Sequence, residues 1–242
     1  MARRPARKSA RSAPANSATP AAPLGERERI VAAFLSLLAE KPLERIGLSE
    51  IAAQAGVSLA QLRAAFSSSL SILAAHLKEV DRAVLAEDLS DMAEEPVRER
   101  LFDVLMRRLE VLAPHRQAVR SLMRSARRNA PLALALNGLA VRSQKWMLAA
   151  AGIGASGPRG ALRAQGLAIL FADVLRTWIR DDDPGLARTM AALDRALARG
   201  QRLSGFLDDL CYIPSRLCRL RPRRRRDTND LDDSEDSVAA EA

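Results

Sequence analysis

The sequence predicts an all-α fold, with a small N-terminal head of three helices and a larger C-terminal helical body. Ala, Leu and Arg, which favour helices, are abundant, whereas aromatic residues make up only 3% of the chain. Apolar residues recur at spacings of three and four along most of the 242 residues. Hydrophobic residues amount to 48%, so the chain can bury a substantial core.

Composition divides the chain into four segments. Residues 1–25 form an arm with five basic side chains and no acid, rich in Pro, Ala and Ser. We expect this arm to be disordered because it has little apolar area to bury. Residues 26–68 are assigned to the head and residues 69–213 to the body. Residues 214–242 form a basic and then acidic tail, which we also expect to be disordered.

The head begins with an amphipathic helix over residues 26–40, which ends before Pro42 because proline disfavours helix at the residue preceding it. Its apolar face comprises Ile30, Val31, Phe34, Leu35, Leu37 and Leu38. The five basic and five acidic side chains of residues 26–66 balance. Contacts with nucleic-acid phosphates would therefore depend on the basic arm.

Two short helices follow over residues 48–55 and 59–66 and are predicted to meet at a sharp corner. Gly56 comes directly after the first helix, where a chain leaving a helix often takes a positive φ. Ser58 is suited to cap the second helix, because its hydroxyl can accept from an unpaired backbone N–H. This is the geometry of a helix-turn-helix, which presents its second helix to a DNA groove.

At these residues the chain resembles the TetR family of bacterial one-component repressors. The matching residues are Ile51, Ala52, Ala55, Gly56, Val57, Ser58 and Phe66. Four positions depart from the family pattern: Gly47 replaces a capping threonine, Arg63 a tyrosine, Ala65 a histidine and Ser69 a lysine. The resemblance implies a homodimeric transcriptional regulator, most simply a repressor, that binds double-stranded DNA.

On this hypothesis the second motif helix lies in the major groove. The residues expected to face the groove are Ser58, Leu59, Ala60, Gln61 and Arg63. Gln61 is suited to an adenine edge and Arg63 to guanine or phosphate. Ser67 and Ser68 are expected either to cap the next helix or to bond phosphate.

The body is predicted to consist of further helices. Their ranges are 69–88, 97–112, 115–128, 131–151, 161–180 and 186–197, with a hinge over 88–96, a loop over 152–160, a turn over 181–185 and a short helix within 201–215. His76, alone on its helix, is expected to be packed or solvated. The basic run 115–128 is expected to be a solvated face, with an acidic partner or an anionic lipid surface as the alternative.

The helix predicted over 161–180 is apolar around most of its circumference, so it must be buried on nearly all sides. One face can pack on its own domain and the other on a second copy of the chain. Together with the helix near 184–200 it resembles the four-helix dimer interface of the TetR family. A twofold dimer would place two recognition helices about 34 Å apart, on successive turns of the major groove.

An apolar small molecule or lipid is a candidate effector that enters between the helices of residues 97–180. The large apolar side chains expected to line its site are Phe102, Met106, Trp146, Met147, Phe171 and Trp178. The alternative is that these side chains simply fill a core. A bound effector would change DNA affinity only by binding the DNA-competent and DNA-incompetent states differently.

A second resemblance points to a different function. Residues 97–120 and 178–197 look like the accessory lipid-binding proteins of ubiquinone biosynthesis, which share the fold but are not repressors. The residues that fit their outline are Asp181, Asp183, Thr189, Leu193, Asp194 and Arg195. A lipid-binding accessory protein with a vestigial DNA head is therefore the alternative function.

Other classes lack their sequence signals. There is no glycine-rich phosphate loop and no GxSxG motif, and the two histidines form no metal-binding pair, so we predict neither an enzyme nor a bound cofactor. Cys211 and Cys218 are interpreted as free thiols rather than a zinc site. No apolar run of roughly 18 residues lacks a charge, and no signal peptide opens the chain, which predicts a cytoplasmic protein without a transmembrane segment.

Overall fold

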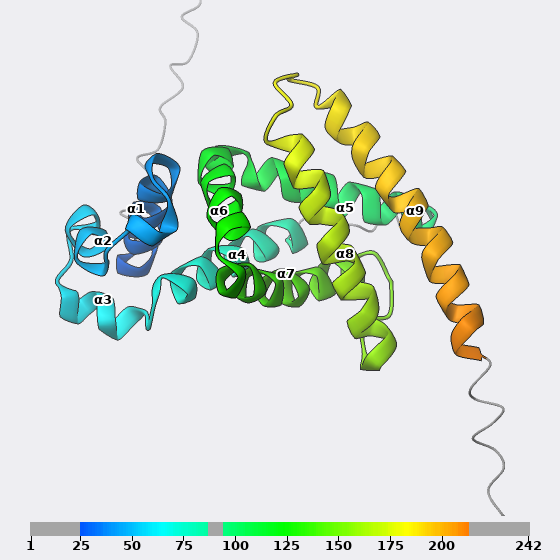
Figure 1. Ribbon diagram of the computed structural model, residues 1–242, viewed down its shortest axis with the longest axis horizontal. Coiled ribbons are helices and arrows are strands. Elements are labelled where there is room, and N and C mark those ends of the chain that lie inside the picture. Colours follow the sequence, from blue (N-terminus) through cyan, green and yellow to red (C-terminus); the bar gives the residue numbers. More distant parts are fainter. Residues whose placement is uncertain (1–24, 87–93, 213–242) are drawn as a thin grey trace, which may run out of the picture.

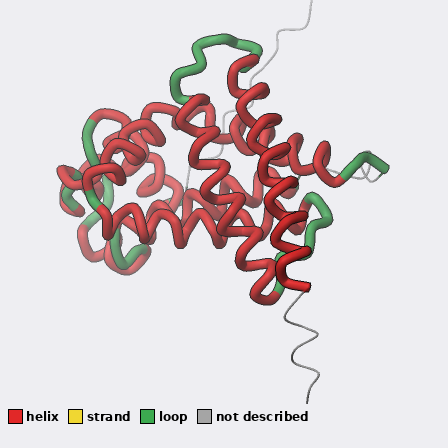
Figure 2. The backbone as a smooth tube through the Cα atoms, turned by 45° about the vertical axis from the view of Figure 1, so that its right-hand side comes forward, coloured by secondary structure: helices red, strands yellow, loops and turns green. Residues whose placement is uncertain are grey.

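The structure is a computed structural model that describes residues 25–86 and 94–212. Within these ranges all regular elements are helical, as predicted (Figure 2). In chain order they are α1 (Glu26–Glu40), η1 (Leu43–Arg45), α2 (Leu48–Ala55), α3 (Leu59–Ala65), α4 (Ser69–Leu85), α5 (Val97–Leu112), η3 (Ala113–His115), α6 (Arg116–Arg128), α7 (Ala130–Ala150), α8 (Gly157–Trp178) and α9 (Ala187–Tyr212). The predicted arm, most of the hinge, the acidic tail and Cys218 lie outside the described residues, as does the side chain of Cys211.

The head consists of α1, α2 and α3, with the first turns of α4 packed beneath them. Its core is a continuous apolar cluster that includes Ile30, Phe34, Leu38, Ile51, Leu62, Phe66 and Ile72. Both Ile72 and Leu73 lie in α4, so this core extends beyond the boundary predicted at residue 68. Figure 1 shows α3 at the outer edge of the molecule, at the end opposite to α9.

The body is built from α4, α5, α7, α8 and α9 around a second apolar cluster. Its fully buried members include Leu105, Leu109, Met147, Ala164, Trp178 and Leu193. Helix α8 packs between α7 and α9, and α5 contacts α4, α7 and α9. The spacing of apolar residues that predicted the helix at 97–112 therefore reflects a face that is buried against three neighbouring helices.

Helix α6 joins the body to the head by packing along α1. The Ser121 hydroxyl donates to the Lys41 carbonyl oxygen over 3.0 Å. The Ser125 hydroxyl donates to a Glu44 carboxylate oxygen over 2.8 Å and accepts from the Leu43 backbone N–H over 3.3 Å. These bonds fix the end of α1 and the following η1 turn against the body.

Three of the predicted helix boundaries are wrong. Helix α4 ends at Leu85, three residues before the predicted end at residue 88. Helix α8 begins at Gly157, four residues earlier than predicted, because Pro158 suits the first turn of a helix. A side chain at Gly160 would collide with the Ala155 backbone, since a Cβ there would lie 2.1 Å from the Ala155 carbonyl carbon. Helix α9 runs through Gly200 to Tyr212, so the predicted end before Gly200 and the separate short helix are not found.

Candidate nucleic-acid interface and body cavity

The corner of the helix-turn-helix is set by three local features. Gly56 ends α2 with φ 62° and ψ 40°, the left-handed conformation that glycine adopts at little cost. The Ser58 hydroxyl accepts from the Gln61 backbone N–H over 3.1 Å. In return the Gln61 side-chain oxygen accepts from the Ser58 backbone N–H over 2.8 Å, which completes a capping box. The predicted cap at Ser58 is confirmed.

The outer face of α3 is open to solvent. Leu62 and Phe66 point into the head core, where they are 3% and 6% exposed. The five residues predicted to face the groove are all exposed: Ser58, Leu59, Ala60, Gln61 and Arg63. Arg63 makes no hydrogen bond or ion pair with any residue that the structure describes, so its guanidinium is available to an anion.

Gln61 is engaged at both ends of its side-chain amide. The oxygen serves the capping box, and the nitrogen donates to the Glu26 carboxylate over 3.0 Å. A contact with an adenine edge would therefore compete with the bond to Glu26. The spacing of Ser58 and Gln61 is the sequence signature of a capping box, so this role could have been found from the sequence.

Residues at the far end of α3 close the motif against its neighbours. The Arg27 guanidinium donates to the Ala65 carbonyl oxygen over 2.7 Å and lies 4.3 Å from the Phe66 ring centroid. The Ser68 hydroxyl accepts from the Ser71 backbone N–H over 3.2 Å and so caps α4, which confirms one of its two predicted roles. Ser67 and Ser68 are both exposed, which leaves contact with phosphate open.

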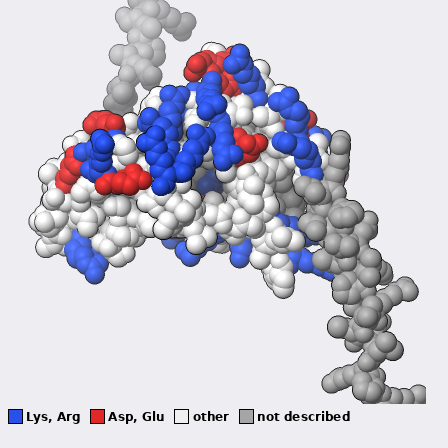
Figure 3. Space-filling model, in the orientation of Figure 1, with Lys and Arg blue, Asp and Glu red and all other residues white. Residues whose placement is uncertain are grey.

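The basic run of α6 has two parts. Arg116 donates from Nε to the Trp178 carbonyl oxygen over 3.1 Å, and Arg120 donates to the Ile179 carbonyl oxygen. These two side chains neutralise the negative end of α8. Arg124, Arg127 and Arg128 are exposed. Figure 3 shows Lys and Arg gathered over α6, whereas the neighbouring head carries mixed charges.

A half-open cavity of about 1450 Å³ lies between the helices of the body, reaches the head and extends over α8 to the exposed side chains of Leu162 and Ile169. Most of its lining is apolar, including Leu77, Leu112, Val119, Leu122, Leu136 and Leu167. Of the six side chains predicted to line a ligand site, Phe171 lines this cavity. Met147 and Trp178 are buried in the body core, and Phe102 and Met106 pack against it. Trp146 is 57% exposed.

The sequence prediction missed a polar group inside this cavity. Arg108 of α5 forms a buried ion pair with Asp81 of α4, and the Ser143 hydroxyl donates to the same carboxylate over 2.5 Å. The His76 and His115 rings meet edge to face with centroids 5.0 Å apart. Burial, followed by the proximity of His115 and Arg108, lowers the pKa of His76 to about 4. His76 is therefore neutral at pH 7 and packed, as predicted.

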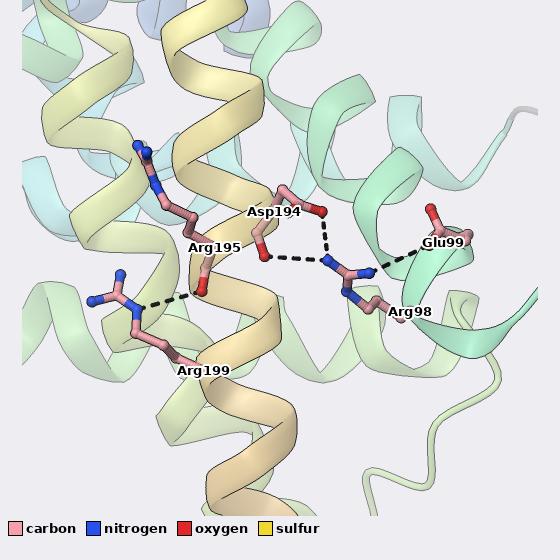
Figure 4. A network of polar contacts seen from close by, with 5 residues as sticks. All are labelled: Arg98, Glu99, Asp194, Arg195 and Arg199. Atoms are coloured by element: carbon pink, nitrogen blue, oxygen red, sulfur yellow. Dashed lines mark hydrogen bonds and ion pairs between the residues drawn. The ribbon is translucent and has the colours of Figure 1, made fainter.

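Two arginines from different helices contribute to the lining of the cavity. Arg98 and Arg199 both line it. Arg98 donates to the Asp194 carboxylate over 2.5 Å and lies 3.6 Å from the Glu99 carboxylate (Figure 4). Figure 4 also shows Arg195 and Arg199 of α9 pointing away from Arg98. The cavity lining therefore includes a cation that is paired with carboxylates, Arg98 on α5, and a second cation, Arg199, on α9.

The aspartates after Trp178 hold the turn between α8 and α9. One Asp181 oxygen accepts from the Thr189 backbone N–H over 2.8 Å and from its hydroxyl over 2.7 Å. The Thr189 hydroxyl bond is the main reason that the pKa of Asp181 is lowered. The Asp183 carboxylate accepts from the backbone N–H groups of Gly185 and Ala187. These bonds hold the turn that is predicted over residues 181–185 and cap the start of α9.

Two further features concern residues 25–86 and 94–212 only. In these ranges no three His, Cys, Asp or Glu side chains are placed to share a metal ion. No helix of the described chain combines the length and the hydropathy needed to cross a membrane.

The arrangement of helices has solved counterparts. A TetR transcriptional regulator from Nitrosomonas europaea is 22% identical, with a TM-score of 0.55 over 72% of this chain and 97% of its own. A TetR regulator from Rhodococcus sp. RHA1 is 22% identical, with a TM-score of 0.52 over 72% of this chain and 95% of its own. A third, from Syntrophomonas wolfei and described as a putative TetR-family regulator, is 17% identical, with a TM-score of 0.52 over 74% of this chain and 94% of its own.

The likeness is one of structure. Neither a protein-family model nor a curated protein matches the sequence. The three solved structures nevertheless match the arrangement of helices over 94–97% of their own length. The chain has the fold of the TetR transcriptional regulators.

Proposed function

We propose that this protein is a homodimeric, non-enzymatic transcriptional regulator that binds double-stranded DNA through α3 and acts in the cytoplasm. The observation that carries the proposal is the exposed α3 surface around Arg63, held outward by a core that buries Leu62 and Phe66. A short capped helix whose outer face is free of the body has the geometry that enters a major groove. The names of the structural neighbours support the same function.

Dimerisation is proposed through α8 and α9. Leu162 and Ile169 of α8 are 52% and 61% exposed, and exposed Gly166 and Asp173 continue the same helical stripe. Two large exposed apolar side chains, two turns apart on one helix face, are suited to a surface that is covered by a partner. These helices lie at the opposite end of the molecule from α3 (Figure 1), so a second copy bound there leaves both recognition helices exposed.

Regulation by a ligand is proposed through the body cavity. Leu35, Leu38, Leu73 and Ala118 belong to the head core and also line the cavity. A ligand that displaces these side chains would change the packing of α1 and α4, which position α3. The head then has one position that can bind DNA and one that cannot. The ligand changes the free energy of DNA binding by the difference between its own binding free energies for these two positions. Repression, with release by the ligand, is the simplest form of this regulation.

The proposal is tested by selecting bound fragments from genomic DNA with the full-length protein, and by titrating the best fragment at several salt concentrations. We expect affinity to fall steeply with salt, because phosphate contacts release counterions. Arg63→Ala should weaken binding by about tenfold, as expected for loss of about 1–3 kcal/mol. Arg180→Ala removes the same charge from an exposed position in the body and should change little. Failure to enrich any fragment would refute the proposal.

The alternative is a lipid-binding accessory protein with a vestigial head. Two observations favour this alternative: the Gln61 side-chain amide is bonded to Glu26 instead of being free to contact a base, and the cavity is large and apolar. Such a protein should co-purify with isoprenoid or phospholipid and should enrich no DNA. Mass spectrometry of an organic extract of the purified protein, compared with the DNA selection, separates the two functions.

A further inference from the structure

The two histidines of the chain meet on the wall of the cavity. His76 of α4 and His115 of η3 both line it, and their rings lie edge to face with centroids 5.0 Å apart. Their ring nitrogens have no hydrogen-bond partner among the described residues, and none of the four is fully buried. Two accessible polar groups side by side in a mainly apolar wall indicate where the polar end of a ligand would lie.

One ligand group can reach both rings. An acceptor that is hydrogen-bonded to an imidazole nitrogen lies roughly 4 Å from the centre of that ring. Since the two centroids are 5.0 Å apart, a single group can stand at this distance from both. A carboxylate suits this position, because each neutral imidazole offers one N–H donor and a carboxylate has two acceptor oxygens.

The surroundings of the histidine pair favour an anion over a cation. Burial, followed by the proximity of His115 and Arg108, lowers the pKa of His76 to about 4. A positive neighbour that disfavours a proton on His76 disfavours a bound metal ion as well. Arg108 is paired with Asp81, so the imidazoles are the groups left to meet the ligand. Arginines outnumber acids in the cavity lining, where Asp173 is the only acidic side chain among the described residues.

The histidine pair lies where the body joins the head. His76 follows Leu73 of the head core by one turn of α4. His115 comes directly before α6, which packs along α1 and bonds to the end of α1 through Ser121. A group held between the two rings therefore links α4 to the start of α6, and both of these helices contact α1.

We propose that the cavity binds an aliphatic carboxylate whose oxygens accept hydrogen bonds from the rings of His76 and His115. Its hydrocarbon chain lies along the apolar wall of α6, α7 and α8, which includes Leu122, Leu136 and Leu167. This inference rests on the proposed role of the cavity as the effector site and names the class of effector.

Binding should be coupled to the uptake of protons. Both histidines are mainly neutral at pH 7 in the free protein, because burial lowers the pKa of each. A carboxylate between the rings favours their charged forms and so raises both pKa values. Between the free and the bound pKa values the complex holds more protons than the free protein. The affinity for the carboxylate should therefore rise as the pH falls from 8 towards 6.

The test is calorimetric titration of the full-length, untagged protein, without DNA, with decanoate, decanol and decylammonium. An apolar cavity without an anion site would take the neutral alcohol more readily than either ion, because burial of an unpaired charge is costly. We expect the opposite order at pH 6.5, with decanoate bound about tenfold more tightly than decanol through charge-assisted hydrogen bonds. Decylammonium should bind most weakly. The affinity for decanoate should fall between pH 6.5 and 8, whereas that for decanol should not.

Variants locate the carboxylate. His115→Phe keeps a ring of similar size without its nitrogens and should abolish the preference for decanoate over decanol. Gln117→Phe introduces the same side chain at an exposed position of α6 that does not line the cavity, and should keep the preference. Arg199→Ala removes an exposed cation of the lining and should also keep it.

The wild-type protein gives an independent measurement. Because the chain holds only two histidines, the NMR signals of their Cε1–H groups report on this site alone. Their titration with pH should show pKa values that are raised by decanoate and unchanged by decanol. This result does not depend on whether His115→Phe folds.

Each contrary result overturns the inference. Tighter binding of decanol than of decanoate, histidine pKa values that decanoate leaves unchanged, or absence of binding by all three probes would exclude a carboxylate at the histidine pair. A preference that survives His115→Phe but is lost with Arg199→Ala would place the carboxylate on α9 instead. None of these results depends on DNA, so the inference can fail while the proposed DNA-binding function stands.

Discussion

The Gln61 side-chain amide donates to the Glu26 carboxylate over 3.0 Å, which ties the exposed face of α3 to the start of α1. The bond places a negative charge beside the surface that is proposed to approach DNA phosphates. It also occupies the Gln61 nitrogen, which would otherwise be free to meet a base. Binding to DNA therefore has to overcome the repulsion between the Glu26 carboxylate and the phosphates. If Gln61 contacts a base, the hydrogen bond between Gln61 and Glu26 is lost as well.

Glu26→Ala should raise the affinity for a selected DNA fragment by about fivefold, since one charge near a phosphate contributes about 1 kcal/mol in water. Fluorescence anisotropy with a labelled duplex measures the change. Glu110→Ala removes the same charge from an exposed position on α5 and should leave affinity nearly unchanged. Unchanged or weaker binding of Glu26→Ala would show that Glu26 lies away from the DNA.

Ser125 should stabilise the joint between head and body. Its hydroxyl is shared by the Leu43 backbone N–H and the Glu44 carboxylate, and its side chain is almost fully buried. Ser125→Ala should lower the free energy of unfolding by about 1–2 kcal/mol, because it leaves these groups without their partner. Urea denaturation measures the loss. Ser36→Ala, on the exposed face of α1, should have little effect, and equal losses would refute a specific role for Ser125.

Stability should depend on the protonation of His76. Its pKa is about 4 in the folded protein and 6.5 in the unfolded chain, so only the unfolded chain takes up a proton between these values. The stability that is present above pH 6.5 should therefore fall as the pH is lowered towards 4, by at most about 3 kcal/mol from this group.

The variant His76→Phe isolates this contribution. His115 and Arg108 face His76 and remain in the variant, and His115 also has a lowered pKa, so part of the pH dependence should persist. The free energy of unfolding, measured in urea between pH 5 and 7, should change less steeply for the variant than for the wild type. Identical slopes would contradict the assignment to His76.

The exposed stripe of α8 should hold the dimer together. Ile169→Asp places a charge at its centre and should convert a dimer to a monomer, since a charge buried in an interface without a partner is strongly unfavourable. Sedimentation velocity measures the change. Leu134→Asp alters an even more exposed leucine, on α7, and should leave the dimer intact. A wild-type protein that is monomeric at micromolar concentration would rule out this dimer.

The head could be predicted from the sequence because local chemistry determines it. Gly56 requires no tertiary contact to end α2, and Ser58 caps α3 through its own backbone neighbours. The start of α8 could also have been found, because Pro158 marks the first turn of a helix. The extension of α9 beyond Gly200 could not, since a glycine is also tolerated inside a packed helix.

The cavity was harder to predict because it depends on which helix faces meet. Trp146 and Met147 are adjacent in sequence, yet one is exposed and the other fully buried. A signal for the polar cluster was present, however. Arg108 falls at helical spacing from Leu101, Val104 and Leu112, so it interrupts a face that the sequence showed to be buried. A charged side chain at such a position predicts a buried partner, here Asp81.

The most direct measurement is a hydroxyl-radical footprint of the full-length protein on the fragment that it selects from genomic DNA. We predict two protected half-sites with centres about one helical turn, roughly 10 base pairs, or a multiple of it apart. The protection should be lost with Arg63→Ala and retained with Arg180→Ala. A single unpaired protected site, no protection, or a footprint that Arg63→Ala leaves unchanged would contradict a dimer that places α3 in successive major grooves.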